Sequence, residues 1–221
     1  MVVTIDGPAG AGKSTAARKL ASALGISFLD TGATYRAATL RAMRAGDDLS
    51  DTGKLLEHAR AMDLKLTPRP DGVHVLLDGL DVSEAIRTED VSRNARYAAS
   101  APAVREVLVE LQRRIGRELG DFVTEGRDQG TVVFPDADVK FYLEASPDER
   151  ARRRREELSQ RGQKADHDEV LRAILARDES DAARSVGPLR VPDGAIRVDT
   201  TGKTIEEMAA ELLRHVREKM K

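Results

Sequence analysis

The chain has 221 residues, of which 40% are hydrophobic, and its 36 basic and 38 acidic residues leave a formal net charge of -2. This length and apolar content suit one α/β core with a small insert. The balanced charge argues against a general nucleic-acid binder, and the absence of Cys excludes disulfides and thiolate metal sites. Local arginine clusters instead favour recognition of small phosphate-bearing molecules.

The N-terminal residues MVVTID lack a charged n-region, and no apolar run approaches the ~20 residues of a membrane span. We therefore expect no signal peptide and no membrane contact. The expected protein is cytoplasmic and monomeric.

Short β-branched runs alternate with helical patterns, which predicts a parallel sheet with helices on its faces. A helix is expected at 102–119, opened by Pro102 and closed by Gly120, and a C-terminal helix begins at the capping box of Thr204 and Glu207. The expected strands are 2–6, 26–30, 122–126, 139–145 and 195–199.

One region departs from this alternation. Residues 63–84 read as three short strand patterns separated by turn signals at Pro70-Asp71-Gly72 and Asp78-Gly79. This predicts a small antiparallel meander, with flanking helices at about 51–62 and 88–101.

The stretch GPAGAGKST matches the phosphate-binding pattern G-x-x-x-x-G-K-[ST]. It lies between an expected strand and an expected helix, so its backbone N–H groups would point at the phosphates of a nucleoside triphosphate. Lys13 would bridge the β- and γ-phosphates, and Ser14 would bind Mg²⁺. The expected ATP-binding residues are Gly7, Pro8, Ala9, Gly10, Ala11, Gly12, Lys13, Ser14 and Thr15.

Two large classes of P-loop protein are disfavoured by missing motifs. The chain has no guanine-reading N-K-x-D segment, and LSQRGQ at 158–163 lacks the glycine pair of the transporter motif L-S-G-G-Q. Small-molecule kinases remain as the leading class.

Two stretches that follow strands can bind an anionic acceptor. In DTGATYR, Thr31 can cap the helix that begins there, and Arg36 then lies near the positive end of that helix. In EGRDQGTVVFPDA, Arg127 and Asp128 lie at the carboxyl edge of a strand, where open α/β sheets bind ligands.

A third stretch, RDESDAAR, spaces Arg177, Asp181 and Arg184 at i, i+4 and i+7, which predicts one helix face. A solvated ladder of ion pairs would have the same spacing, so the pattern alone leaves both interpretations open. The four histidines show no metal-ligand spacing.

Together these strings closely resemble the bacterial cytidylate kinase family, the ATP-dependent kinases of CMP and dCMP. The resemblance extends from TIDGPAGAGKST to the C-terminal helix and is most specific in DTGATYR, GRDQGTVVFPDA, SPDERARRR and RDESDAAR. It implies transfer of the γ-phosphate of MgATP to CMP or dCMP, giving CDP or dCDP and ADP. The alternatives are a kinase of another nucleoside monophosphate or of a shikimate-like acceptor, and, less favoured, a P-loop regulatory NTPase.

The resemblance also implies residue roles. Arg36 and Arg127 would hold the acceptor phosphate, while Arg177 and Asp181 would meet the sugar. Thr31, Arg105, Asp128 and Arg184 would surround the cytosine, and Tyr35 completes the expected CMP-binding set. Arg96 stands where the family has a small hydroxyl residue, so Ser92 or Ser100 could supply that ribose contact instead.

SPDERARRRREEL at 146–158 predicts a helix that begins with a capping box of Ser146 and Glu149. Pairs Arg152–Glu156 and Arg153–Glu157 would support an exposed helix. The resemblance makes this segment the arm of a mobile lid, in which Arg150 and Arg153 or Arg154 approach ATP. The expected catalytic residues are Lys13, Arg127, Arg150 and Arg153.

The expected fold class is the three-layer α/β fold of P-loop NTPases, with a five-stranded parallel sheet, a small antiparallel monophosphate-binding insert and a helical lid. In this single domain, the core would comprise about 1–48, 102–148 and 186–221, the insert about 49–101 and the lid about 149–185.

Overall fold

A computed structural model of the chain describes residues 1–69, 72–160 and 162–220. The chain forms two compact units, one of Met1–Ile26 with Val123–Lys221 and the other of Ser27–Phe122. The predicted insert lies within the second unit. Among the described helices, none combines the length and the apolar character needed to cross a bilayer.

The predicted five-stranded parallel sheet is confirmed. Its order is β2-β6-β1-β7-β8, so β1, the strand before the glycine-rich loop, occupies the centre. The strands are β1 (Val2–Asp6), β2 (Ser27–Asp30), β6 (Phe122–Gly126), β7 (Val139–Glu144) and β8 (Ile196–Asp199). All five agree with the sequence prediction to within one residue at each end.

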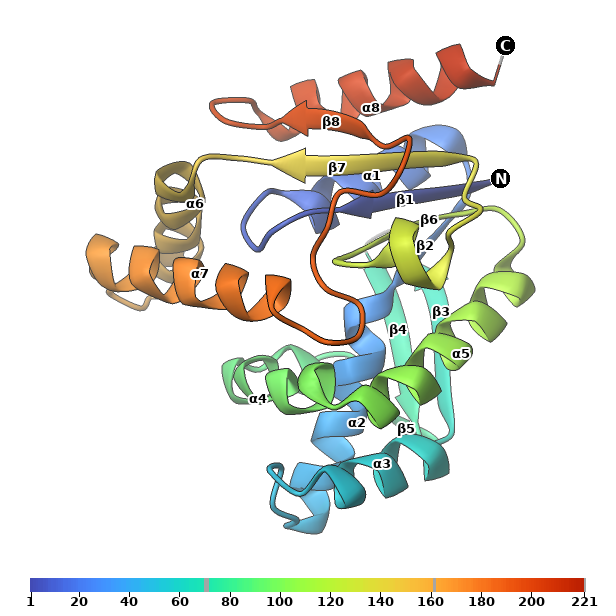
Figure 1. Cartoon of the computed structure of the whole chain (residues 1–221), viewed down its shortest axis with the longest axis vertical. Coiled ribbons are helices and arrows are strands. Elements are labelled where there is room, and N and C mark those ends of the chain that lie inside the picture. Colours follow the sequence, from blue (N-terminus) through green and yellow to red (C-terminus); the bar gives the residue numbers. More distant parts are fainter. Residues whose placement is uncertain (70–71, 161, 221) are drawn as a thin grey trace. The chain divides into compact units, whose positions relative to one another are not determined.

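In the first unit, β7 pairs in parallel with β1, with Val3 opposite Val139, and with β8, with Phe141 opposite Ile196. The helices α1 (Lys13–Leu24) and α8 (Ile205–Lys219) pack together (Figure 1). Fully buried Leu20 on α1 and Leu212 on α8 contribute to this core. Burying such side chains stabilises the unit by roughly 1.5–3 kcal/mol each.

The predicted start of α8 is confirmed in detail. Thr204 accepts a hydrogen bond from the N–H of Glu207 at 3.2 Å, and the Glu207 carboxylate accepts one from the N–H of Thr204 at 2.8 Å. This capping box satisfies backbone donors that the first helical turn leaves without partners.

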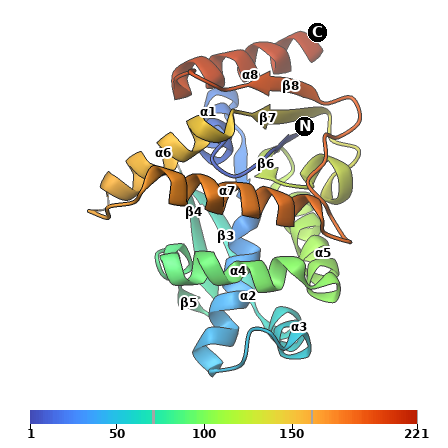
Figure 2. The same ribbon diagram turned by 60° about the vertical axis from the view of Figure 1, so that its left-hand side comes forward.

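Two antiparallel helices, α6 (Pro147–Gln160) and α7 (His167–Ala182), pack side by side in the first unit (Figure 2). Ala151, Val170 and Ile174 form the small apolar cluster between them. Both helices carry long charged side chains on the rest of their surfaces, so this hairpin has little apolar core of its own.

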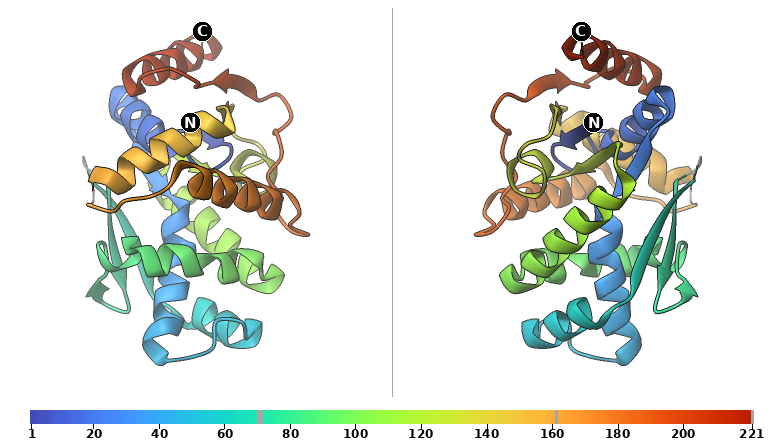
Figure 3. Two further views of the ribbon diagram at one scale, coloured as in Figure 1. Left: turned by 90° about the vertical axis from the view of Figure 1, so that its left-hand side faces the viewer. Right: turned by 90° about the vertical axis from the view of Figure 1, so that its right-hand side faces the viewer.

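The second unit contains the predicted antiparallel meander, with β4 paired to both β3 and β5 (Figure 3). The predicted turn at Asp78-Gly79 is present, and both residues have positive φ angles of 50° and 81°. The turn predicted at 70–72 lies largely outside the described residues. The meander strands are β3 (Leu64–Arg69), β4 (Gly72–Leu77) and β5 (Leu80–Asp81), and the 3₁₀ turn η1 (Ala85–Arg87) follows.

Four helices complete this unit: α2 (Thr31–Ala45), α3 (Thr52–Ala61), α4 (Glu89–Ser100) and α5 (Pro102–Leu119). Helix α5 has the predicted bounds. Its buried face includes Val104, Leu108 and Ile115, as the helical spacing predicts.

Three local predictions were wrong. The cap of α2 is Asp30, whose carboxylate accepts from the N–H of Ala33, and Thr31 is the first helical residue. Helix α7 ends at Ala182, so Arg184 lies beyond it and does not share its face. Arg153 pairs with Glu149 rather than Glu157, because its other guanidinium nitrogens bind the hydroxyl of Thr200 and backbone carbonyls of the loop after β8.

Candidate functional site

The glycine-rich loop connects β1 to α1 in the first unit, as predicted (Figure 1). Gly7 has a φ of 147°, and a Cβ there would lie 2.0 Å from the Leu143 carbonyl oxygen. Gly12 precedes α1 in a left-handed conformation with φ 83°. Only glycine tolerates both demands, so the loop can bring its backbone close to a phosphate.

Lys13 is buried at the start of α1, and its Nζ donates to the carbonyl oxygen of Pro8 at 2.7 Å. Burial and, to a smaller extent, the nearby positive charge of Arg127 together lower the pKa of Lys13 to about 7. The loop therefore holds an ammonium group that a polyanion would stabilise.

Ser14 donates a hydrogen bond from its Oγ to a carboxylate oxygen of Glu125 on β6, at 2.8 Å. Hydroxyl and carboxylate oxygens are the ligands that Mg²⁺ prefers, directly or through water. The residues present thus fit the expected magnesium site, and Glu125 is a candidate ligand that the sequence prediction missed. The signal in the sequence that could have identified Glu125 was its position near the carboxyl end of a predicted strand.

Residues of two further segments, α6 and the loop after β8, donate hydrogen bonds to backbone carbonyl oxygens of the phosphate loop. Arg150 of α6 is buried, and its Nη1 donates to the carbonyl oxygen of Ala9 at 3.1 Å and pairs with Asp178 of α7 at 2.6 Å. Thr200, directly after β8, donates from Oγ1 to the carbonyl oxygen of Ala11 at 3.2 Å.

Arg153 lies one turn further along α6 and is held by four acceptors. Its guanidinium donates to Glu149 at 2.9 Å, to Thr200 Oγ1 at 3.2 Å, to the Thr200 carbonyl oxygen at 2.5 Å and to the Lys203 carbonyl oxygen at 3.5 Å. In the structure, both arginines predicted to be catalytic in the lid helix are therefore engaged with protein groups beside the phosphate loop.

A charged cluster occupies the acceptor side of the first unit. Arg127 donates from Nε to an Asp181 carboxylate oxygen at 2.7 Å, and Arg184 pairs with the other oxygen. Burial disfavours the charges on Arg127 and Asp181, but their mutual attraction outweighs it, so the pKa of Arg127 is raised and that of Asp181 is lowered. Arg127 and Asp181 are therefore both charged at neutral pH.

Asp128 and Arg177 complete the predicted residues of this unit. Asp128 is buried with 4% of its surface exposed, and its backbone carbonyl begins the short π-helical turn η2 (Gln129–Val133). Arg177 is exposed on α7, one turn before Asp181, and its charge contributes to lowering the pKa of Lys13.

The remaining four predicted acceptor residues lie in the second unit. The Arg36 guanidinium donates to Asp30 at 2.9 Å, and Arg87 of η1 approaches the same carboxylate oxygen at 3.5 Å. Arg105 is buried, and its guanidinium carbon lies 5.5 Å from the centre of the Tyr35 ring. Thr31 is buried, too.

Arg87 and Asp30 are thus two further candidate residues of the acceptor site, and the spacing of residues in the sequence did not reveal them. Arg96, the residue that departs from the family pattern, is exposed on α4 and its guanidinium stacks 5.0 Å from the Tyr97 ring.

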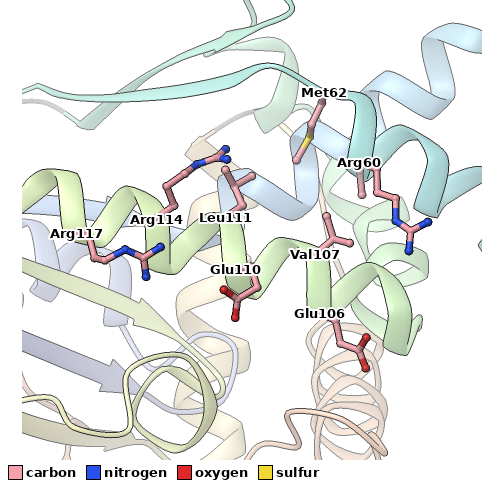
Figure 4. A pocket seen from close by; sticks show the side chains of 9 residues that line it. Arg60, Met62, Glu106, Val107, Glu110, Leu111, Arg114 and Arg117 are labelled. Atoms are coloured by element: carbon pink, nitrogen blue, oxygen red, sulfur yellow. The ribbon is translucent and has the colours of Figure 1, made fainter.

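An open groove of about 530 Å³ lies between the end of α3 and α5 in the second unit. Figure 4 shows Val107 and Leu111 on the side of α5 that faces Met62, whereas Glu106 and Glu110 point away. None of the predicted site residues lines this groove. It is therefore not the site described above.

The central strand, the glycine-rich loop and its buried lysine define a P-loop α/β phosphotransferase. The family of cytidylate kinases matches residues 3–218 of the chain. The chain is 48% identical over 219 residues to a cytidylate kinase of Caldanaerobacter subterraneus subsp. tengcongensis, covering 99% of this chain and 96% of that protein. It is 50% identical over 220 residues to a cytidylate kinase of Rhodopirellula baltica, covering 99% and 93%. The chain belongs to the cytidylate kinase family.

A solved structure, an uncharacterized protein from Eubacterium ventriosum, has the same fold at a TM-score of 0.50, with 11% identity and 98% of each chain covered. This likeness bears on the fold alone.

Proposed function

We propose that the protein transfers the γ-phosphate of MgATP to the 5′-phosphate of CMP or dCMP. One observation carries the proposal beyond the family assignment: Arg127, expected to hold the acceptor phosphate, is close enough to Lys13 of the triphosphate loop for its charge to lower the Lys13 pKa. Residues suited to two phosphate groups thus lie within electrostatic range of each other in one unit.

The proposed ATP site comprises residues 7–15, with Lys13 neutralising the γ-phosphate. Ser14 and Glu125 would hold Mg²⁺, which supplies charge neutralisation on the phosphate oxygens when bound. The acceptor would be bound by Arg36, Arg127, Arg177 and Asp181 and read by Thr31, Tyr35, Arg105, Asp128 and Arg184.

These residues position two anions and offset their repulsion. Phosphoryl transfer has a loose transition state, so positioning and electrostatics supply most of the catalysis. The attacking group is a phosphate oxygen that is already ionised at neutral pH, so no general base is required. The arginines near α6 would help to exclude water, which otherwise hydrolyses ATP.

Arg150 is proposed to act through the phosphate loop, whereas Arg153 is proposed to contact ATP itself. Arg150 donates to the Ala9 carbonyl oxygen, which fixes the loop beside α6 and α7. Arg153 lies next to Gly12, 3.7 Å from where a Cβ would stand. It is the better candidate of the two to reach ATP, because exchanging its carbonyl contacts for phosphate oxygens would cost little.

The proposal is tested by ADP release from MgATP with CMP, dCMP, UMP, AMP, GMP, shikimate or no acceptor. We expect strong turnover with CMP and dCMP only. Turnover that is equal without any acceptor would instead indicate a regulatory ATPase, and preference for another acceptor would select that kinase. Sedimentation of the same sample tests the proposed monomer.

Binding of MgATP should take up a proton at pH 8. Lys13 has a pKa of about 7 in the free protein and would be charged against the triphosphate, so uptake should approach about 0.9 proton per site at pH 8 and fall to about 0.1 at pH 6. Calorimetry in buffers of different ionisation enthalpy measures this number. The Lys13→Met variant should show no uptake at either pH, and equal uptake by both proteins would contradict the assignment to Lys13.

A further inference from the structure

A buried carboxylate outside the predicted site holds the segment that follows Asp128. Asp6 is the last residue of β1, directly before Gly7, and none of its surface is exposed. Its two carboxylate oxygens accept from the backbone N–H groups of Gln129, at 2.8 Å, and Gly130, at 2.7 Å. One side chain therefore binds both peptide donors that come directly after Asp128.

These bonds fix the start of the π-helical turn. The Asp128 carbonyl oxygen accepts from the N–H groups of Val132 and Val133 at 2.9 and 3.1 Å. At Gly130, a Cβ would lie 2.9 Å from Thr4 Oγ1, so the turn packs directly on β1. Both hydrogen bonds that the Asp6 carboxylate accepts in the described part of the chain thus come from the segment that follows Arg127 and Asp128.

Keeping the buried Asp6 side chain ionised costs free energy, because burial disfavours its charged form. Burial raises the pKa of Asp6 most, the two peptide N–H groups and Lys13 oppose this effect, and the Asp128 charge adds to it. The balance of these effects is a pKa of about 6. Tyr142 also lies within electrostatic range of Asp6, whose charge helps to raise the Tyr142 pKa. Because a carboxylate alone offers one acceptor oxygen to each of the two donors, the site retains it despite the cost of burial.

We propose that Asp6 is a positioning residue that couples the triphosphate loop to the Arg127–Asp128 segment. Asp6 immediately precedes the loop and holds the segment by its backbone, so it sets where the acceptor phosphate and the base are bound relative to the γ-phosphate. This inference rests on the proposed function, since Asp128 is assigned to the base.

Asp6→Asn is the direct test, because the amide keeps the size of the side chain but turns one acceptor into a donor that faces a peptide N–H. We expect kcat/KM for CMP to fall about 30-fold and the CMP:UMP ratio of kcat/KM to fall at least about fivefold. Thr4→Val is the matched control: Thr4 is equally buried on β1, and its hydroxyl has no hydrogen-bond partner among the described residues. It should keep both values within about twofold.

A folded Asp6→Asn protein with an unchanged CMP:UMP ratio overturns the proposal, whether or not its rate falls. Failure of the proposed function is distinct, because wild-type protein would then not phosphorylate CMP at all.

A measurement on wild-type protein covers the case in which the variant does not fold. Backbone amide NMR between pH 5 and 7.5 should show Gln129 and Gly130 titrating together near pH 6, with Arg127 and Asp128 following the same curve. If Gly130 titrates while Arg127 and Asp128 stay constant, Asp6 does not position them and the proposal fails.

Discussion

Lys13→Ala should fold and lose phosphoryl transfer by about 10³-fold or more in kcat, a loss of roughly 4 kcal/mol in transition-state stabilisation. The backbone of the loop would still surround the phosphates, but the charge beside the γ-phosphate would be gone. The side chain is buried, and among the described residues its ammonium has the Pro8 carbonyl oxygen as its hydrogen-bond acceptor and no ion-pair partner. Its loss therefore removes no ion pair from the fold.

The measurement is kcat at saturating MgATP and CMP, with thermal melting as the check of folding. Lys19→Ala is the matched control on the same helix, because Lys19 is exposed and, among the described residues, its ion-pair partner is Glu206 of α8 at 2.9 Å. An exposed pair of this kind contributes about 0–1 kcal/mol, so kcat should stay within about twofold. A Lys13→Ala enzyme with half of wild-type turnover would remove Lys13 from the mechanism.

The sequence was most informative where the cause of a structure is local. The strands, α5, the capping box of α8 and the glycine-rich loop each depend on neighbouring residues, and each was confirmed. Gly7 shows why the motif is specific: its φ of 147° and the 2.0 Å approach of the Leu143 carbonyl exclude a side chain.

Predictions failed where residues distant in the chain decide between local options. Arg153 could pair with Glu149 or Glu157 at equal helical spacing, and the carbonyl oxygens of residues 200 and 203 select the first. Thr31 and Asp30 are both good caps. Asp30 takes the role while its other oxygen binds Arg36.

Contacts between distant parts of the chain also explain why the sequence prediction missed some residues of the candidate site. Each of these residues is identified as part of the candidate site only by its contact partner. Asp6 contacts Gln129, 123 residues away, and Glu125 contacts Ser14, 111 residues away. Arg87 approaches Asp30, 57 residues away. No spacing rule within one segment connects such pairs. The functional residues that were predicted stand in short strings, whereas those that hold them in place are scattered.

Specificity for the base gives the second large expected effect: Asp128→Ala should damage the use of CMP far more than the use of UMP. Cytosine presents an amino donor at N4, where uracil presents an acceptor, and a carboxylate accepts from the first and repels the second. Asp128 is buried, with 4% of its surface exposed. An unmatched polar group in such surroundings costs roughly 1–3 kcal/mol, which is about tenfold or more per mismatch.

The measurement is kcat/KM for CMP and UMP in wild type, Asp128→Ala, Asp128→Asn and Asp136→Ala. Wild type should strongly prefer CMP, and both Asp128 variants should lose at least about tenfold of that preference, since the Asn amide can turn to accept from cytosine or donate to uracil. Asp136 is an exposed carboxylate in the loop that follows the same turn, so its variant should keep the wild-type ratio. Because Arg105 and Arg184 would remain to serve the N3 and O2 acceptors of cytosine, some preference for CMP should survive. A ratio that Asp128→Ala leaves unchanged would mean that Asp128 does not read the base.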